Sequence, residues 1–229
     1  MTVSALSPDR DTDEPRSLAG QTYDTLRLRL ITGRMMPGVA FSTRSLAREL
    51  DISQTPVRDA LARLAAEGAI EIRSKRRITV PEMTRNRYDD LMHCRLLLEP
   101  AAAVQALAFI DAAMIKRLVA IDAEIDAALE SGDVEAYMRG NFMFHFLIYR
   151  ARPQPITQRL IETLWAQFGP FMRVIYGLSG TATLIDRHQE AIAAIRNADP
   201  AALHRAISQD IADGMRLIEH AALSATLAP

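Results

Sequence analysis

Two short segments in the first third of the chain carry side chains suited to binding a polyanion. The first is the amino end of a predicted helix and presents Gln54, Thr55 and Arg58. The second is the continuous run Lys75, Arg76 and Arg77. Amide and guanidinium groups pair with the edges of bases, whereas lysine and arginine charges attract phosphates. These residue types in this order predict a surface that binds DNA.

The charge of the chain is unevenly divided between its two parts. Residues 15–81 hold twelve lysines and arginines against six aspartates and glutamates, although the formal net charge of the whole chain is only -1. From Glu82 onward the acidic residues outnumber the basic ones. We therefore expect a nucleic-acid-binding domain over residues 15–81 and an all-helical domain with another role over residues 82–229.

Three helices and a hairpin are predicted around the basic side chains. Apolar periodicity and capping residues indicate a first helix near 18–32, a second that Ser42 or Thr43 caps and that ends near Asp51, and a third from Ser53 to about Glu67. Pro56 falls in the first turn of the third helix, where its missing N–H has no acceptor to lose. Two alternating runs, 69–73 and 77–80, then predict a β-hairpin. This order of elements forms a winged helix-turn-helix.

The remainder of the chain is rich in alanine and leucine and predicts helices only. Their expected positions are 84–109, 112–131, 134–151, 155–176, 183–197 and 200–222. A proline inside a helix costs about 3 kcal/mol or kinks the chain, so we expect the first of these helices to be bent or split at Pro100. The fold class is therefore mainly α, a winged helix-turn-helix followed by an all-α bundle.

The sequence also indicates where the protein acts. Residues 1–14 are polar and acidic, lack the pattern of a signal peptide, and predict a disordered leader. No apolar run approaches the roughly 20 residues that cross a bilayer, so we expect no membrane contact. Cys94 is the single cysteine, which excludes an internal disulfide and fits a reducing cytoplasm.

The segment from Met36 to Gly68 resembles the signature of the GntR family of bacterial transcription regulators. The matching residues are Met36-Pro37-Gly38, the stretch Leu46 to Leu64 with its ordered core Ser53-Gln54-Thr55-Pro56-Val57-Arg58-Asp59-Ala60-Leu61, and Glu67-Gly68. The helical part, with Arg95 to Glu99 and Phe144-His145, resembles the ligand-sensing FCD domain of the FadR-like branch of that family. The resemblance implies a ligand-responsive repressor or activator that dimerises through the helical domain and binds a pseudo-palindromic operator in double-stranded DNA.

The resemblance also extends the set of DNA-contacting residues. It implies that Arg44 touches DNA and that the hairpin wing contacts a groove or the backbone. Family members commonly carry arginine where this chain has Gln54, which shifts the expected base preference from guanine toward adenine. The wing lacks its usual glycine, so we expect its lysine and arginines to act through attraction to phosphate.

A divalent metal site in the helical domain is a further implication of the resemblance. The corresponding positions are Asn141, His145, His188 and Asp210. Asn141 and His145 are four residues apart and share a helix face. Asn141 replaces a frequent aspartate and Asp210 replaces a histidine, so zinc, nickel and manganese all remain candidates, with a shift toward harder ions. The alternative is that the two histidines pack in the core without a ligand.

Arg95 precedes Glu99 by one helical turn, on a helix that the resemblance places along the same cavity. A buried arginine offers a rigid fork for a carboxylate, so Arg95 is a candidate to bind a small organic acid as effector. The alternative is an Arg95–Glu99 ion pair on the surface. The spacing alone allows both.

Two other classes of function compete with a regulator. A metal-dependent hydrolase needs a general base beside an open metal position, but the chain has no HExxH motif, nucleophile elbow or phosphate-binding loop, so we expect no catalytic residues. An architectural DNA-binding protein has little use for a large acidic helical domain. A sequence-specific transcription regulator is therefore the expected function.

Overall fold

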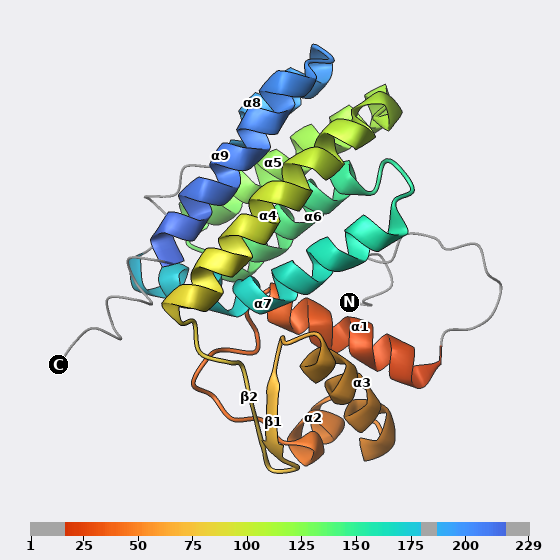
Figure 1. Cartoon of the computed structure of the whole chain (residues 1–229), viewed down its shortest axis with the longest axis vertical. Coiled ribbons are helices and arrows are strands. Elements are labelled where there is room, and N and C mark those ends of the chain that lie inside the picture. The colour runs from red at the N-terminus through yellow and green to blue at the C-terminus, as the bar shows by residue number, and fades with distance from the viewer. Residues whose placement is uncertain (1–16, 180–186, 219–229) are drawn as a thin grey trace.

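The computed structural model describes residues 17–179 and 187–218. Figure 1 shows two stacked units, with short helices and a hairpin at one end and a bundle of longer helices at the other. Helix α1 of the first unit lies against α7 of the second. The mainly α fold class predicted from the sequence is confirmed.

The first unit is a winged helix-turn-helix. Its elements are α1 (Leu18–Ile31), α2 (Thr43–Glu49), α3 (Gln54–Ala66), β1 (Glu71–Ser74) and β2 (Arg77–Thr79). The Ser42 hydroxyl accepts the backbone N–H of Ser45, and the Ser45 hydroxyl accepts that of Ser42, which fixes the start of α2. Gly68 follows α3 with a φ of 72°, a left-handed conformation that ends the helix and costs glycine little.

The core of this unit forms between α1 and α3. Val57, Leu61 and Leu64 lie on one face of α3 and are at most 1% exposed. They pack with Leu26 and Leu30 of α1, which are fully buried. Each such side chain stabilises the fold by about 1.5–3 kcal/mol when it leaves water. This burial fixes the rotation of α3 and leaves its opposite face to solvent.

The second unit is a helical bundle. Its elements are α4 (Arg85–Ala106), the 3-10 turn η2 (Leu107–Phe109), α5 (Ala112–Ser131), α6 (Val134–Tyr149), α7 (Pro155–Ser179), α8 (His188–Arg196) and α9 (Pro200–Ile218). Asp111 and Asp133 cap α5 and α6 by accepting backbone N–H groups of their first turns. The expected leader 1–14, the start of the helix expected at 183–197, and the end of that expected at 200–222 lie outside the described residues. Within the described ranges, no helix is long and apolar enough to cross a membrane.

Pro100 corrects one expectation. The helix is not split there, because α4 continues as one element from Arg85 to Ala106 with Pro100 buried inside it. Proline removes one backbone donor, but α4 is held along its length by α9, α7 and α6, and this packing offsets the loss. A second interior proline, Pro170, lies in α7 and is also buried.

The two units are joined by direct contacts at the end of α3. Arg87 Nη2 of α4 donates to the Gly68 carbonyl at 2.8 Å and to Gln167 Oε1 of α7 at 2.7 Å. Gln167 Nε2 donates to the Glu67 carbonyl at 3.0 Å. Two helices of the bundle therefore hold the carboxyl end of α3, the helix that presents the basic surface.

Glycine at position 169 allows α7 to approach α1 closely. A Cβ atom there would lie 2.5 Å from the Ile31 carbonyl oxygen, a distance that real Cβ atoms do not reach. Gly33, just after α1, has a φ of 70°, and a Cβ on it would overlap the Arg173 side chain. The two units thus meet closely at these points, through backbone at Gly169 and through the Arg173 side chain at Gly33, and neither position accepts a side chain without a shift.

Candidate functional site

The amino end of α3 presents three polar side chains to solvent. Gln54, Thr55 and Arg58 are exposed, on the face opposite the buried residues of the helix. Arg58 Nη2 donates to Thr55 Oγ1 at 3.2 Å, which holds the guanidinium near the first turn. Arg44 is exposed on α2. The structure therefore leaves each of these predicted DNA contacts accessible on the same unit.

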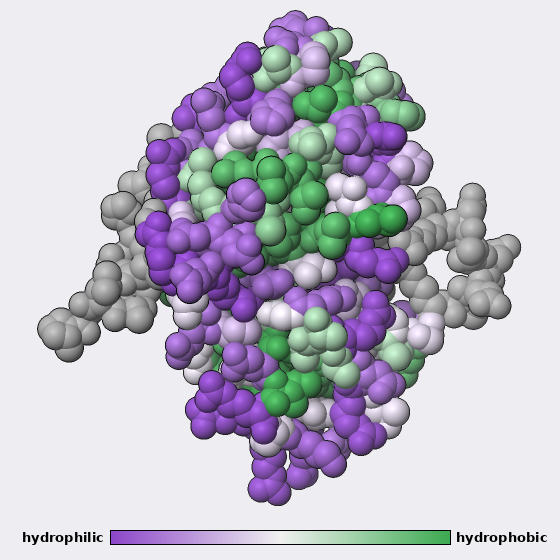
Figure 2. All heavy atoms as spheres, viewed as in Figure 1, coloured by the Kyte–Doolittle hydropathy of each residue, from purple (hydrophilic) through white to green (hydrophobic). Residues whose placement is uncertain are grey.

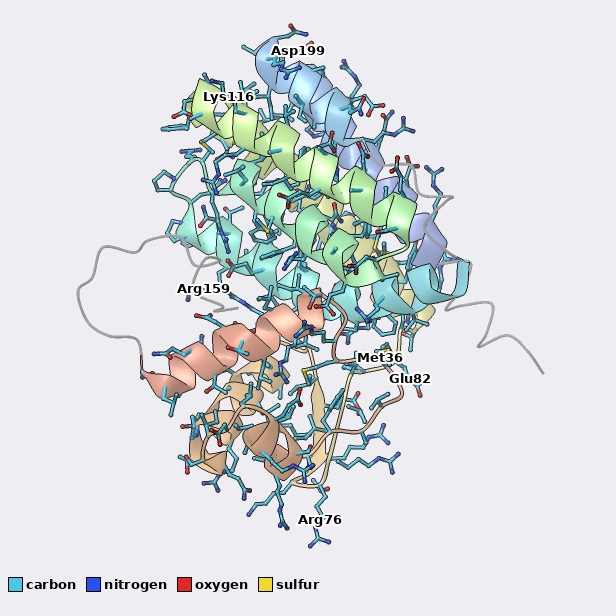
Figure 3. The ribbon with its side chains drawn as sticks, turned by 180° about the vertical axis from the view of Figure 1, so that it is seen from behind. Met36, Arg76, Glu82, Lys116, Arg159 and Asp199 are labelled. Carbon is cyan, nitrogen blue, oxygen red and sulfur yellow. The ribbon has the colours of Figure 1, made fainter. Side chains whose placement is uncertain are left out.

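The hairpin brings the remaining basic residues beside α2. The Lys75 carbonyl accepts the backbone N–H of Thr43 at 3.4 Å, and Arg76 stands at the tip of the molecule farthest from the bundle (Figure 3). Lys75, Arg76 and Arg77 are all exposed. Neither Lys75 nor Arg76 has a positive φ, and the backbone N–H of Arg76 donates to Ser74 Oγ at 3.3 Å. The turn is thus formed without the glycine that wings of this kind usually carry.

Tyr23 supports α3 from behind. Its hydroxyl donates to the Glu67 carboxylate at 2.8 Å, and the Arg63 guanidinium lies 3.7 Å from the ring centroid. Burial, opposed by the Arg27 charge and aided by Glu67, raises the pKa of Tyr23 to about 12. The phenol therefore stays protonated and keeps α1 attached to the carboxyl end of α3.

A second candidate site lies inside the bundle. His145 of α6, His188 of α8 and Asp210 of α9 place ligand atoms within 4.8 Å of one another. Each histidine is only 1% exposed. Asn141 Oδ1, one turn before His145, lies 3.1 Å from His188 Nε2. The structure thus brings together all four residues that the sequence suggested as metal ligands.

Tyr149 determines which nitrogen of His145 keeps a lone pair for the cluster of His145, His188 and Asp210. The Tyr149 hydroxyl donates its single proton to Glu99 Oε2 at 2.9 Å, so its oxygen accepts from His145 Nδ1 at 3.1 Å. Burial and the Glu99 charge raise the pKa of Tyr149 well above its ordinary value, which keeps that proton in place. In the neutral imidazole, Nε2 then carries no proton and points toward Asp210.

The gap between His145 and Asp210 suits a cation. His145 Nε2 lies 3.1 Å from Asp210 Oδ2. Burial alone would raise the pKa of the Asp210 carboxyl, but when the two imidazoles are protonated, the hydrogen bond and charge of His145, the charge of His188 and the backbone N–H of Arg187 hold it well below its usual range. A carboxylate facing an imidazole lone pair needs a positive charge between them, either a proton or a metal ion. The donor set of nitrogen and oxygen atoms therefore fits a divalent cation.

Arg95 forms an ion pair with Glu99, but not on the surface. Arg95 Nε donates to Glu99 Oε1 at 2.6 Å, and the two residues are 4% and 0% exposed. Glu99 Oε2 also accepts Trp165 Nε1 at 2.9 Å, and the guanidinium carbon of Arg95 lies 3.8 Å from the Phe168 centroid. The surface alternative is wrong because α7 covers this face of α4.

Comparison with known proteins places both units in one family. Residues 18–80 match the bacterial regulatory proteins of the gntR family, and residues 90–213 match the FCD domain. The chain belongs to the GntR family. It is a transcription regulator with an amino-terminal DNA-binding domain and a ligand-sensing FCD domain.

Named relatives of this GntR-family regulator agree with that assignment. The HTH-type transcriptional regulator McbR of Escherichia coli (strain K12) is 31% identical over 186 residues, covering 80% of this chain and 84% of McbR. The gluconate operon transcriptional repressor of Bacillus subtilis (strain 168) is 25% identical over 209 residues, covering 87% and 84%. The solved structure of E. coli McbR/YncC has a TM-score of 0.84 at 27% identity and covers 90% of this chain and 99% of that one. These relatives are DNA-binding regulators and give the hydrolase no support.

Sequence reasoning missed two polar partners of the histidines in this GntR-family regulator. Asp122 of α5 lies 3.2 Å from His188 Nδ1, and Tyr149 bonds His145. Asp122 is four residues after Leu118 and three before Ile125, both fully buried. A carboxylate on the apolar face of a helix was therefore the signal that could have found it. Tyr149, one turn after His145, gave no comparable signal.

Proposed function

We propose that this GntR-family regulator is a repressor that binds its operator as a homodimer and responds to a small organic acid. The cluster of His145, His188 and Asp210 inside the FCD domain is the observation that carries the sensing role. Two relatives are named as gluconate operon repressors, which favours repression and makes gluconate the first acid to test. Residues 15–81 bind DNA, residues 82–229 bind the effector and dimerise, and the protein acts in the cytoplasm.

DNA recognition falls to the exposed end of α3 and to the hairpin. Helix α3 enters the major groove, where Arg58 reads a base and Gln54 favours adenine. Thr55 and Arg44 complete this contact surface. The basic turn formed by Lys75, Arg76 and Arg77 lies beside α2 and contacts phosphates. The support is that all of these side chains are exposed on one unit and none contributes to its core.

The test on the DNA side compares a base contact with a phosphate contact. Arg58→Ala should weaken operator binding by about 1–3 kcal/mol and relax specificity at one position. Arg76→Ala should weaken operator and random DNA alike and lower the salt dependence by about one charge. Fluorescence anisotropy with an operator selected from random DNA measures both. Equal losses on operator and random DNA for Arg58→Ala would refute its assignment to a base.

Within the FCD domain, Asn141, His145, His188 and Asp210 hold a divalent metal ion, with zinc, nickel and manganese as the candidates. When bound, the ion supplies a positive charge that attracts the carboxylate of the effector. His145 offers Nε2, because Tyr149 occupies its other nitrogen. Asp210 offers a carboxylate oxygen 3.1 Å from that nitrogen, and its other oxygen accepts the backbone N–H of Arg187 at 3.1 Å. These properties suit ligands better than core packing residues.

Arg95 is the second anchor for the effector. Glu99 contacts Nε and Nη2 of the guanidinium, so Nη1 is the nitrogen that receives the effector carboxylate. Arg95 is connected to His145 through Glu99 and Tyr149, by hydrogen bonds of 2.6, 2.9 and 3.1 Å. A ligand that displaces one of these partners therefore changes the bonding of the others.

Helix α7 connects the sensing site with the DNA-binding domain. Trp165 bonds Glu99, and its ring centroid lies 5.4 Å from that of His145. Gln167, two residues later, bonds the carboxyl end of α3 through the Glu67 carbonyl. An effector that prefers one position of α7 thereby changes how α3 is held, which shifts the population of DNA-binding arrangements.

Calorimetry with Zn(II), followed by gluconate and other small hydroxy acids, tests the sensing role. The wild type should bind Zn(II), and the variant His145→Ala with His188→Ala should lose that binding. His204→Ala, which changes an exposed histidine of α9, is the matched control and should bind as the wild type does. The metal role fails if the wild type binds no divalent ion at micromolar concentration, or if the double variant binds it unchanged.

The dimer contact is assigned to the apolar face shared by α4 and α7. Leu97 of α4 is 60% exposed, and Ile156 and Leu160 of α7 are 79% and 50% exposed. Figure 2 shows hydrophobic side chains gathered over these two helices. A second copy of the chain is the proposed occupant of this face. Two DNA-binding domains, one from each copy, match the two half-sites of a pseudo-palindromic operator. Light scattering of Leu97→Glu with Leu160→Glu should show a monomer, and a persistent dimer would place the interface elsewhere.

A further inference from the structure

Asp122 is a buried carboxylate that neither DNA binding nor metal ligation uses. It is 6% exposed on α5, and its Oδ1 lies 3.2 Å from His188 Nδ1. Asp122 does not belong to the group whose ligand atoms fall within 4.8 Å of one another. It therefore approaches the imidazole at one nitrogen, while the other nitrogen, Nε2, lies 3.1 Å from Asn141 Oδ1.

The plane of the His188 ring is set by stacking. The ring lies on Phe144 with a centroid distance of 4.0 Å and an interplanar angle of 28°. Stacking restricts the plane but does not distinguish a ring from the same ring turned by 180°. The polar contacts at its two edges make that choice. Asp122 Oδ1 is enclosed and forms no hydrogen bond of good geometry within the described part of the chain, and His188 Nδ1, 3.2 Å away, is the donor within its reach.

We propose that Asp122 is a positioning residue for the metal site. It accepts the proton of His188 Nδ1 and so keeps the lone pair on Nε2, which faces Asn141 at the site of the proposed cation. This inference rests on the proposed metal role of the FCD domain. Carboxylates that hold the second nitrogen of a ligating histidine fix its tautomer and raise its basicity. Asp122 also places a negative charge near a site in which Asn141 supplies none.

Removal of Asp122 should reverse the tautomer. Without an acceptor at Nδ1, the neutral imidazole gains most by donating from Nε2 to Asn141 Oδ1, 3.1 Å away. That proton then occupies the position a metal ion needs, so binding has to displace it. The loss expected is about ten- to a hundred-fold in metal affinity.

The first experiment reads the tautomer directly. Long-range nitrogen–proton NMR spectra of the metal-free, full-length protein, at a pH where the imidazole is neutral, should show the proton of His188 on Nδ1. Asp122→Leu should move it to Nε2, whereas Asp122→Asn, which keeps an oxygen acceptor, should restore part of the original state. Asp126→Leu, one turn later on α5 and exposed, is the matched control and should leave the tautomer unchanged. A wild-type proton on Nε2, or no change in Asp122→Leu, overturns the proposal.

The second experiment measures Zn(II) affinity by competition with a coloured chelator. Asp122→Leu should bind Zn(II) about ten- to a hundred-fold more weakly, Asp122→Asn should fall between it and the wild type, and Asp126→Leu should match the wild type. An unchanged affinity in a folded Asp122→Leu variant overturns the positioning role. If the wild type binds no Zn(II), the metal role fails, and the NMR result alone decides whether Asp122 sets the tautomer. The leucine is expected to fold, since its neighbours Leu118 and Ile125 are fully buried.

Discussion

Removal of the charge on Glu99 should be costly, although the substitution is nearly isosteric. Glu99 is fully buried and accepts hydrogen bonds from Arg95, Tyr149 and Trp165. Glu99→Gln keeps one carbonyl oxygen as acceptor but leaves the Arg95 guanidinium without a counter-charge. The substitution therefore measures what the ion pair contributes to the free energy of unfolding, with the shape of the side chain almost unchanged.

The magnitude follows from burial. Breaking a buried ion pair by removing one partner costs about 3–5 kcal/mol, because the remaining charge stays desolvated. Since Gln retains an acceptor for Trp165 or Tyr149, we expect the lower end, about 3 kcal/mol. Adding Arg95→Met removes the stranded charge, so the double variant should recover most of that loss. The double variant should therefore lose clearly less stability than the sum of the two single variants, which is the signature of a coupled pair.

Helix α4 supplies a matched control with the same spacing. Arg85 Nε and Asp89 Oδ2 lie 3.0 Å apart, but the two side chains are 59% and 53% exposed. Asp89→Asn should change the free energy of unfolding by about 0.5 kcal/mol or less, because water screens an exposed pair.

Urea unfolding followed by tryptophan fluorescence measures all of these variants. Trp165 is the only tryptophan of the chain, is 1% exposed and bonds Glu99, so it reports on the FCD domain. A loss below about 1 kcal/mol for Glu99→Gln, similar to that of Asp89→Asn, would refute the reasoning. It would mean that the Arg95–Glu99 pair is neutral or hydrated in the folded protein.

Three further outcomes test other parts of the structure. Burial raises the pKa of Tyr23 from 10.0 to about 12, so the stability that the protonated phenol contributes is complete below pH 10 and is lost as the pH rises to about 12. In urea unfolding at a series of pH values, Tyr23→Phe should remove this loss of stability. Gly169→Ala should lower the free energy of unfolding by about 1–3 kcal/mol in the same assay, because its Cβ meets the Ile31 carbonyl. Gly38 has a φ of 78° and no atom within 4 Å of a Cβ, so Gly38→Ala measures the cost of backbone strain alone. Gln167→Leu should leave Zn(II) binding intact and weaken the response of DNA binding to the effector, as anisotropy titrations with and without the acid would show. An unchanged response would remove Gln167 from the coupling between the domains.

The DNA-binding half was predictable because its local signals agree with one another. The apolar spacing of Val57, Leu61 and Leu64, the proline in the first turn and the closing glycine all indicate the same helix in the same rotation. The helix was expected to bend or split at Pro100, and the split is wrong because helix propensity is a local property. Packing against α9, α7 and α6 decides the outcome there, and a single sequence does not show that packing.

Helix spacing and family resemblance predicted the four candidate ligands of the histidine site, but not the residues that surround them. Four-residue spacing placed Asn141 and His145 on one face, but no spacing rule connects them with Asp122 on another helix. The same limit explains Arg95 and Glu99. Their spacing indicates a pair, whereas its burial depends on α7, which follows about 60 residues later in the chain.

The close contacts at Gly169 and Gly33 have a consequence for genetic selections on this regulator. Glycine codons change by single nucleotides to codons for larger residues, and at these two positions a larger residue meets the Ile31 backbone or the Arg173 side chain, so the contact between α1 and α7 must shift. Such alleles would keep the residues proposed to read bases and the histidine cluster intact while loosening the contact between the two units. If the proposed repressor role holds, a screen for strains that still occupy the operator but ignore the inducer should therefore recover substitutions at these glycines, outside the residues proposed to contact DNA or effector.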